Sequence, residues 1–579
     1  MKHIGGNILN LMEAQQTIAK QLEQVLLQFD QVDLTTSQIS DLIEVPKNSD
    51  LGDFAFPTFQ LAKQLHQAPV KIAQQIVADL DSSAFAKVVA QGPYVNFFLQ
   101  RPAIVTQTLA TVVTTGEHFG DQQTGQQARI VIDMSSPNIA KPMSMGHLRS
   151  TVIGNSIALI LNKLNYHPVK INHLGDWGTQ FGKLMVAYKK WGSEADVKKD
   201  PITNLQKYYV KFHKLDKEHP ELDEEAREWF KKLENGDEEA TQLWQWFRSE
   251  SLKSFMKIYD ELGITFDSYN GEAFYNDKMD EILDLLEHKG LLQESKGAEI
   301  VDLGPDMPPA LIKKSDGATL YITRDLAAAL YRKRTYHFKK SLYVVGSEQS
   351  NHFEQLKAVL AKMGFTWAQD TEHIKFGLIT TNGKKLSTRE GRVILLENVL
   401  HDSVQLAQEQ IEEKNPTLTN KEQVAHAVGV GAVIFHDLKN NRTDSFDFNL
   451  EDVVRFEGET GPYVQYTHAR AMSILRKAGS QAQDEAAVFD TDVDDVTWDI
   501  LKHLANFPET VQQAAQLREP SVIAKYALHL AKSFNHYYAQ TKVLVDDDQL
   551  AARLNLVQAV AIVLKEALRL LGVQAPDEM

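Results

Sequence analysis

Residues 133–154 read DMSSPNIAKPMSMGHLRSTVIG, and this stretch decides the fold of the chain. The three residues before it form a short β-branched apolar run, which is typical of a buried strand. Pro137 and Pro142 prevent regular structure from continuing across the first half of the stretch. From Gly146 onward, apolar residues return at helical spacing. The pattern therefore predicts a strand, a loop and a helix, the unit from which open α/β sheets are built.

A loop of this kind is a candidate nucleotide site. Ligands of open α/β sheets bind at the carboxyl ends of the strands, where the N-terminus of the next helix attracts anions. Gly146 allows a nucleotide to approach the backbone closely, and His147 in the first turn can donate a hydrogen bond to phosphate. On shape alone, an ordinary strand-to-helix turn with a solvated histidine is an equal alternative.

The order of the residues in this stretch favours the nucleotide site. Residues 144–147, Ser-Met-Gly-His, resemble the His-Ile-Gly-His signature of class I aminoacyl-tRNA synthetases, and the flanking SSPNIAKP and GHLRSTVIG resemble the arginyl-tRNA synthetases in particular. Ser144 replaces the first histidine of that signature. The resemblance implies that Ser144, Gly146 and His147 bind ATP and that His147 is catalytic.

A second stretch, residues 382–391, reads NGKKLSTREG. It resembles the Lys-Met-Ser-Lys-Ser loop of the same class, which implies that Lys385 and Ser387 bind ATP and that Lys385 is catalytic. A lysine on a mobile loop can neutralise the charge that develops on departing pyrophosphate. Thr388 stands in place of the second lysine, and we expect Lys141 in the first loop to supply the missing charge. The alternative is that Lys141 is a solvated loop charge.

Tyr321 and Asp325 are candidates for binding the side chain of a cationic substrate. We expect a hairpin strand at residues 320–322, turning at Asp316-Gly317, to lead into a helix that begins near Asp325. A guanidinium prefers a bidentate carboxylate partner, although Asp325 as a helix N-cap is an equal alternative on position alone. The string YITRD matches the arginine pocket of the family. By the same resemblance the arginine contacts include Ser136, Asn138, Gln349 and the weaker candidate Glu272.

The remaining strands are expected to complete one parallel sheet around this site. The loop HLGDWGTQFG, residues 173–182, resembles the family's second active-site loop, and Asp176 in it is a candidate hydrogen-bond acceptor or helix N-cap. The expected strands are residues 130–132, 169–172, 300–301, 342–346 and 374–381.

Both ends of the chain resemble tRNA-binding parts of the family. A helical pattern at residues 11–31 and a strand near residues 92–99 predict an α+β unit, and the resemblance places Tyr94 and Asn96 against the tRNA elbow. A strand tyrosine is more often a core residue. Residues 393–579 predict a helical tail that resembles the anticodon-binding domain. Its candidate stacking tyrosines are Tyr463, Tyr466 and Tyr537, of which we expect at least one to be core.

Composition sets the remaining bounds. The chain has 579 residues, no cysteine and a formal net charge of -16, which excludes disulfides and thiolate metal sites and argues against nonspecific nucleic-acid binding. No apolar run approaches membrane-spanning length, and no secretory signal precedes the first unit. We therefore expect a cytoplasmic protein, and a monomer, without a membrane partner.

The combined prediction is a Rossmann-like α/β class I catalytic domain between an N-terminal α+β domain and a C-terminal all-α anticodon-binding bundle. The expected domains are residues 1–120, residues 121–392 with a helical insertion at about 189–262, and residues 393–579 with the bundle from about 456. The resemblance implies an arginine–tRNA ligase that uses ATP with Mg²⁺, has no protein metal site and binds arginine and its cognate tRNA, which such enzymes usually need to form the adenylate. Two alternatives remain: a same-fold enzyme with another substrate, and a catalytically inactive RNA-binding relative.

Overall fold

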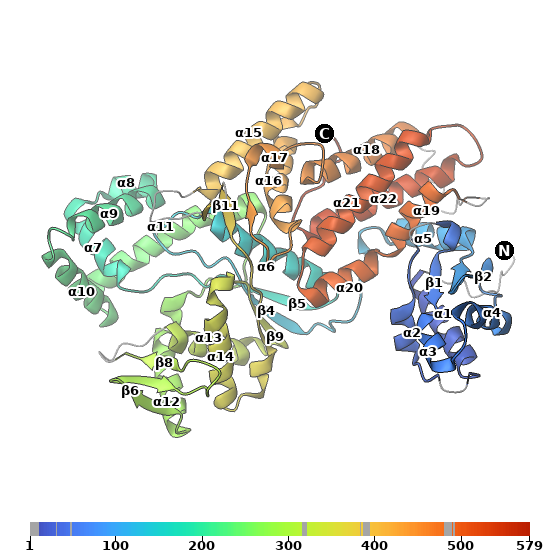
Figure 1. The fold of residues 1–579 in the computed structure, drawn as a ribbon. Helices are drawn as coiled ribbons and strands as arrows, with labels where there is room; N and C mark the ends of the chain where they lie inside the picture. Colours follow the sequence, from blue (N-terminus) through green and yellow to red (C-terminus); the bar gives the residue numbers. More distant parts are fainter. Residues whose placement is uncertain are drawn as a thin grey trace.

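The computed structural model describes residues 11–29, 32–46, 49–314, 321–381, 384–385, 394–479, 489 and 493–579. It is an elongated chain with a central parallel sheet, a helical insertion on one side and the N-terminal unit and C-terminal helices on the other (Figure 1).

The central sheet has four parallel strands in the order β10-β9-β4-β5. Ile130 and Ile132 of the middle strand belong to the main hydrophobic core, whereas Val131 between them packs with Phe338 in a separate cluster on the other face. Alternation within one strand therefore covers both faces of the sheet. This confirms the predicted strand at residues 130–132 and a parallel strand at each of the other two places, although β5 ends one residue before the predicted 169–172 and β9 covers only residues 342–343 of the predicted 342–346. The strands are β4 (Arg129–Asp133), β5 (His167–Ile171), β9 (Lys340–Tyr343) and β10 (Thr371–His373).

Two expected strands lie elsewhere. Residues 300–301 belong to an antiparallel sheet, β6-β7-β8, because the two-residue turn at Lys296 and Gly297, both with positive φ, returns the chain directly beside itself. Residues 374–381 do not form one strand: β10 ends at His373, and β11 pairs in a third sheet of order β12-β11-β13. These strands are β6 (Leu292–Ser295), β7 (Ala298–Val301), β8 (Ala310–Lys313), β11 (Ile379–Thr381), β12 (Lys384–Lys385) and β13 (Phe446–Asp447).

The helix that follows β4, α6 (Met145–Lys163), is buried on nearly every side. It packs against β5 and against the C-terminal helices α16, α20 and α22. Its polar side chains are paired: Arg149 contacts Asp437 at 3.2 Å, and Lys163 contacts Glu566 at 2.8 Å. Buried charges need such partners. The predicted signature helix is thus confirmed, and it is also the element on which the C-terminal helices rest.

The helical insertion and the helices around the sheet complete the catalytic part. The insertion begins after α7 and ends with the long helix α11, and it packs on α7. The helices are α7 (Gln180–Trp191), α8 (Glu194–Lys199), α9 (Pro201–Leu215), α10 (Glu221–Glu234), α11 (Glu238–Leu262), α12 (Met279–His288), α13 (Tyr321–Tyr336) and α14 (Ser350–Lys362).

In the described residues beyond 394, helices joined by loops make up the chain and β13 is the only strand, as the predicted helical tail requires. Helices α18, α21 and α22 form the centre of the C-terminal bundle, and α16 joins it to α6. The helices are α15 (Leu396–Lys414), α16 (Lys421–Leu438), α17 (Leu450–Val453), α18 (Gly461–Ala478), α19 (Asp495–Ala505), α20 (Phe507–Leu517), α21 (Ser521–Gln540) and α22 (Leu550–Leu570).

The N-terminal unit is an α+β domain, as predicted, with an antiparallel sheet of order β1-β3-β2. It docks on α19 through Asp53, whose carboxylate accepts a 2.7 Å hydrogen bond from Nε1 of Trp498. The guanidinium of Arg101 lies over the Trp498 ring and reaches Asp53 at 3.5 Å. Trp498 and Asp53 are both buried at this contact. The elements are α1 (Leu11–Leu26), α2 (Thr36–Leu42), β1 (Phe54–Pro57), α3 (Phe59–Leu65), α4 (Pro69–Asp79), β2 (Lys87–Gln91), β3 (Tyr94–Phe98) and α5 (Arg101–Thr115).

Within the described residues, no helix combines the length and apolar character needed to cross a membrane.

Candidate active site

The loop between β4 and α6 is held in an unusual backbone conformation. Ser135, Ser136 and Ala140 have positive φ, which non-glycine residues rarely adopt. Buried hydrogen bonds maintain it: the Ser135 N–H donates to Oγ of Ser150 at 2.8 Å, and the Ser136 N–H donates to Oδ1 of Asn172 at 3.2 Å. The loop is therefore shaped before any ligand binds.

Asn138 of this loop lies against the loop after β5. The Ile139 N–H donates to the carbonyl of Gly175, and the Gly175 N–H donates to the carbonyl of Pro137. A Cβ on Gly175 would lie 2.3 Å from Oδ1 of Asn138, so a larger residue there would displace the Asn138 side chain. The two predicted active-site loops are thus brought together. The Ser136 side chain is bound within the protein, since its hydroxyl donates to Oδ1 of Asp133 at 3.1 Å.

His147 lies in the first turn of α6, next to Ser144. The backbone N–H of Ser144 donates to Nδ1 of His147 at 3.0 Å, which assigns the ring proton to Nε2. Burial lowers the pKa of His147, and the nearby charge of Lys141 lowers it further, against the opposing hydrogen bond from Ser144. His147 is therefore a neutral imidazole with Nε2–H free to donate. Gly146 beside it is exposed.

The structure describes the backbone on either side of the second signature. Lys385 pairs with Thr380 through the backbone, and its side chain and Ser387 lie outside the described residues, as does the Asp316-Gly317 turn. After the loop, the chain returns to α6, because the Met145 N–H donates to the carbonyl of Ile394 at 3.1 Å. The backbone of residues 394–396 is thus paired with residues 143–145 at the start of α6.

Tyr321 and Asp325 occupy one face of α13, at its N-terminal end. The expected strand at residues 320–322 is wrong: α13 already begins at Tyr321, so the pair is related by one helical turn. Nε2 of His352 lies 2.6 Å from Oδ2 of Asp325. Burial lowers the pKa of His352, but the Asp325 carboxylate outweighs it and raises that pKa overall. The Tyr321 side chain is 65% exposed.

Glu272 joins this group from the insertion side. Its carboxylate lies 3.6 Å from Arg324, the residue before Asp325. Burial raises the pKa of Glu272 to about 7 against the effect of Arg324, and Asp325 and Asp176 add to the rise. The charges of Asp325 and Asp176 both act on Glu272, so the three carboxylates lie near one another at the sheet end. Such an arrangement suits a cationic ligand.

Asp176 is not a helix N-cap, because α7 begins at Gln180. Its carboxylate accepts from Nε of Arg248 at 2.8 Å and from the backbone N–H of Ala273 at 2.9 Å. The residue is buried and committed to Arg248, a residue of α11, so it orders the loop and contributes charge to its surroundings. Gln349, the predicted contact after β9, lies exposed in a short 3₁₀ turn.

A buried ion pair that the sequence did not indicate supports the floor of the site. Arg332 of α13 lies 2.7 Å from Asp133 at the end of β4, and both are nearly inaccessible. Arg332 also contacts Nδ1 of His173 at 3.2 Å. The pair joins the helix that carries Asp325 to the strand that carries the first loop. Because the partners are about two hundred residues apart, no local pattern marks them.

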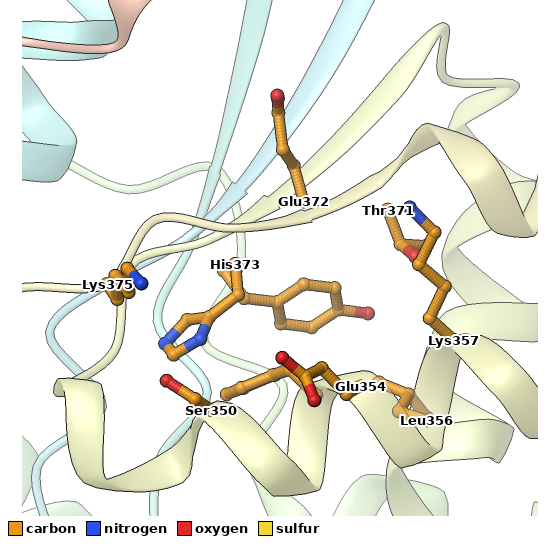
Figure 2. Close-up of a pocket in the computed structure, with 10 residues that line it drawn as sticks. Ser350, Glu354, Leu356, Lys357, Thr371, Glu372, His373 and Lys375 are labelled. Atoms are coloured by element: carbon orange, nitrogen blue, oxygen red, sulfur yellow. The ribbon is translucent and has the colours of Figure 1, made fainter. Parts of the chain in front are cut away.

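A separate hollow of about 260 Å³ lies between α14 and the edge strand β10, lined by Ser350, Glu354 and His373 among others (Figure 2). None of the predicted site residues lines it. It borders the site through Phe353, whose ring lies 5.3 Å from that of His352. The hollow is a neighbour of the candidate site and not part of it.

The two residues predicted to contact the tRNA elbow differ in how exposed they are in the structure. Tyr94 is half-buried and its ring lies 5.6 Å from that of Phe59, edge to face; Phe59 is 49% exposed. Asn96 is 2% exposed and donates to Gln91 within the sheet. Its neighbours cover Asn96 in this structure, and its contact with the tRNA elbow stays a prediction. Phe59 was not predicted.

The three tyrosines predicted to contact the anticodon also differ in how exposed they are. Tyr537 is fully buried at 1% exposure, so it is the expected core tyrosine and offers no surface for stacking. Tyr463 is half-buried and accepts a hydrogen bond from Asn535. Tyr466 is exposed, and the guanidinium of Arg470 lies 4.9 Å from its ring and 5.3 Å from that of Tyr538. Arg470 and Tyr538 were missed, and the four-residue spacing of Tyr466 and Arg470 on α18 is the signal that could have indicated the first of them.

Three family models match consecutive parts of the chain. "Arginyl tRNA synthetase N terminal domain" matches residues 12–99, "tRNA synthetases class I (R), catalytic domain" matches residues 108–450, and "DALR anticodon binding domain" matches residues 464–579.

Full-length relatives agree. The arginine–tRNA ligase of Lactiplantibacillus plantarum is 70% identical over 548 residues, covering 94% of this chain and 97% of that protein. That of Enterococcus faecalis is 62% identical, covering 98% and 100%. The solved Thermus thermophilus arginyl-tRNA synthetase matches with a TM-score of 0.79 at 26% identity, covering 98% of this chain and 100% of that one.

Proposed function

The chain belongs to the arginyl-tRNA synthetases, the class I enzymes that use ATP to join arginine to tRNA, and from this membership we propose how its residues divide the work. One observation carries the proposal. The Asp325 side of α13 and the loop that enters α6 lie at the same end of the parallel sheet: Arg332 of α13 is paired with Asp133 at the end of β4, and the charges of both Asp133 and Asp325 act on His173 in the loop after β5. A site for phosphate and a site for a guanidinium thus adjoin.

Arginine binds on the α13 side. Asp325 and Glu272 receive the guanidinium, and the exposed ring of Tyr321 closes over it from the same helical face. The α-amino and α-carboxylate groups bind to Ser136, Asn138 and Gln349. This orientation directs the α-carboxylate toward α6.

ATP binds on the α6 side, with Gly146 and Ser144 against the nucleotide and His147 and Ser387 at the phosphates. An oxygen of the arginine carboxylate attacks the α-phosphorus, and pyrophosphate leaves. Nε2–H of His147 donates to the phosphate oxygens, and Lys141 and Lys385 neutralise charge on the leaving group. Mg²⁺ enters as part of the ATP substrate. No covalent enzyme intermediate is required.

The second step uses the same site. The hydroxyl of the 3′-terminal adenosine of the tRNA attacks the carbonyl carbon of arginyl-adenylate, and AMP leaves. The tRNA is held at two distant surfaces: Phe59 and Tyr94 at the elbow, and Tyr466, Arg470 and Tyr538 at the anticodon. Aromatic rings with exposed faces can stack on unpaired bases, which supports both assignments.

The domains follow from these roles. Residues 1–120 bind the elbow, residues 121–392 hold the catalytic site with its insertion, and residues 393–579 carry the anticodon bundle from about residue 456. The cytoplasm, where ribosomes use aminoacyl-tRNA, is the proposed compartment, and a monomer with both tRNA surfaces on one chain is the proposed state.

The division of roles is tested by ATP–pyrophosphate exchange with arginine and tRNA present. His147→Asn is expected to lower turnover about 10²- to 10³-fold with little change in the KM for arginine. Glu272→Gln is expected to raise that KM while turnover at saturating arginine is largely kept. If His147→Asn changed the KM for arginine and Glu272→Gln changed turnover alone, the two sides of the site would be assigned wrongly.

A further inference from the structure

We propose that Tyr209, in the helical insertion, is a positioning residue for Lys141 during adenylate formation. The Nζ of Lys141 lies 6.0 Å from the centre of the Tyr209 ring, within the range of a cation–π contact. Tyr209 belongs to α9, a helix to which no part of the reaction has been assigned above. The inference rests on the proposed role of Lys141 at the leaving pyrophosphate.

The insertion already holds the loop on either side of this contact. The hydroxyl of Tyr259 lies 2.8 Å from Oγ of Ser135, and the backbone N–H of Ala140 donates to Oγ of Ser251 at 3.1 Å. Tyr259 and Ser251, both in α11, are fully buried. The backbone immediately before Lys141 is thus tied to α11, and the only freedom left to this lysine is in its long side chain.

An aromatic partner suits the task better than a carboxylate. A carboxylate would neutralise the ammonium that must act on phosphate, whereas a ring face orients the ammonium and leaves its charge available. In the described part of the chain, Lys141 forms no salt bridge. The Tyr209 ring is itself fixed, since it is half-buried and lies edge to face on His213 at 4.5 Å. Burial also raises the pKa of Tyr209, so the ring is a neutral phenol.

Lys141 also lies near His147, because its charge contributes to the lowered pKa of that imidazole. With the backbone held by Ser251 and the side chain by Tyr209, Lys141 is ordered before ATP binds. Ordering a lysine in advance reduces the side-chain entropy that is lost in the transition state.

The test compares Tyr209→Leu with Tyr209→Phe in tRNA-supported ATP–pyrophosphate exchange. Tyr209→Leu is expected to lower turnover about two- to fivefold, the size of a partly exposed cation–π contact, with an unchanged KM for arginine. Tyr209→Phe keeps the ring and is expected to keep turnover. Trp191→Leu is the matched control: it removes the ring that lies 4.6 Å from Lys211, elsewhere in the same region, and should leave turnover unchanged.

A double-mutant cycle separates positioning from a structural role. In a Lys141→Ala background, Tyr209→Leu should have no further effect. An equal loss in both backgrounds, or the same loss in Tyr209→Phe, would overturn the inference. Tyr209→Gln, checked for an unchanged melting temperature, serves if the leucine variant is unstable. If Lys141→Ala itself keeps near-normal turnover, the proposed function of Lys141 fails; if Lys141→Ala is impaired and Tyr209→Leu is normal, the positioning role alone fails.

Discussion

Nε2 of His352 lies 2.6 Å from Oδ2 of Asp325, so the carboxylate proposed to receive arginine already has a histidine partner. The contact fixes one carboxylate oxygen and leaves the other for a ligand. It also joins α13 to α14, since the two residues belong to these helices.

Asp325→Ala should weaken arginine binding far more than ATP binding. A guanidinium that is buried on binding and has lost its carboxylate partner costs about 3–5 kcal/mol, which is at least a hundredfold in the KM for arginine. Steady-state exchange kinetics with each substrate varied in turn measure both constants. Glu354→Gln, on α14 at the hollow of Figure 2, is the control and should behave as the unchanged enzyme. An unchanged arginine KM with weakened ATP binding would contradict the assignment.

Arginine affinity should rise with pH. Burial raises the pKa of Glu272 to about 7, so the group is partly protonated near neutral pH. A bound guanidinium favours the carboxylate and lowers this pKa, so binding releases a proton and tightens as pH rises between about 6 and about 8. His352 acts in the same direction, because its protonated form holds Asp325. Calorimetric titration in two buffers of different ionisation heat counts the protons.

The control for this pH dependence is Glu272→Gln, in which the slope should flatten to the smaller part due to His352. Proton uptake on binding, or an affinity that falls with rising pH in the unchanged enzyme, would rule out the carboxylate cluster as the guanidinium site.

Lys141→Ala should lower turnover by about two to three orders of magnitude, the size of one lost transition-state charge contact, with little change in arginine binding. Thr388→Lys in that background restores the lysine that the second signature lacks, and partial recovery is expected. Exchange rates at saturating substrates measure both. If Thr388→Lys does not restore turnover, only the idea that Lys141 compensates for the missing loop lysine is contradicted. Normal turnover in Lys141→Ala would instead show that Lys141 has no part in the mechanism.

Tyr94→Ala should weaken tRNA binding by about 1–3 kcal/mol, the usual contribution of one base stacked on an aromatic ring. Phe59→Ala should do the same, because the exposed Phe59 ring lies edge to face against the Tyr94 ring. The measurement is the KM for tRNA in aminoacylation, with the arginine KM expected to stay constant. Val70→Ala changes an exposed apolar residue of the same unit and is the control. Equal tRNA affinity in all three variants would exclude this surface.

Asp437→Leu should destabilise the enzyme, because it leaves Arg149 buried at 1% exposure without its acid partner. The expected loss is about 3–5 kcal/mol, and the double variant Arg149→Met/Asp437→Leu should recover most of it. Thermal melting compares the variants. The exposed pair Arg334 and Glu281 provides the control, since removing it should change little. A double variant no more stable than Asp437→Leu would show that packing, not charge, is lost.

Local patterns were sufficient for the frame of the site. The alternation at residues 130–132 and the helical spacing from Gly146 depend on neighbours in sequence, and both predictions are confirmed. The residues around Tyr321 show the limit: a short apolar run is compatible with strand or helix, and the chain forms a helix there. Expected strand 300–301 was real but joined a different sheet.

Long-range contacts were beyond reach of the sequence. The Arg332–Asp133 pair and the Ser251–Ala140 hydrogen bond join residues more than a hundred positions apart. The burial of single polar residues could not be predicted from the sequence either. Asn96 and Tyr537 have suitable chemistry for RNA, but neighbouring elements cover both. Tyr209 was not predicted, because the pattern of its helix is that of an ordinary solvated helix. Only its contact with Lys141 in the neighbouring loop indicates a role.

The docking of Trp498 on Asp53 gives the enzyme a built-in optical reporter. The chain has seven tryptophans, and Trp498 is the last, far in sequence from the other six. Its indole is shielded at 1% exposure by the N-terminal unit, with a carboxylate on its N–H and a guanidinium on its face. If the unit lifts away when tRNA binds or leaves, water replaces both groups and the emission shifts to longer wavelength. The difference spectrum between the unchanged enzyme and Trp498→Phe would then follow that motion in real time, without an attached dye.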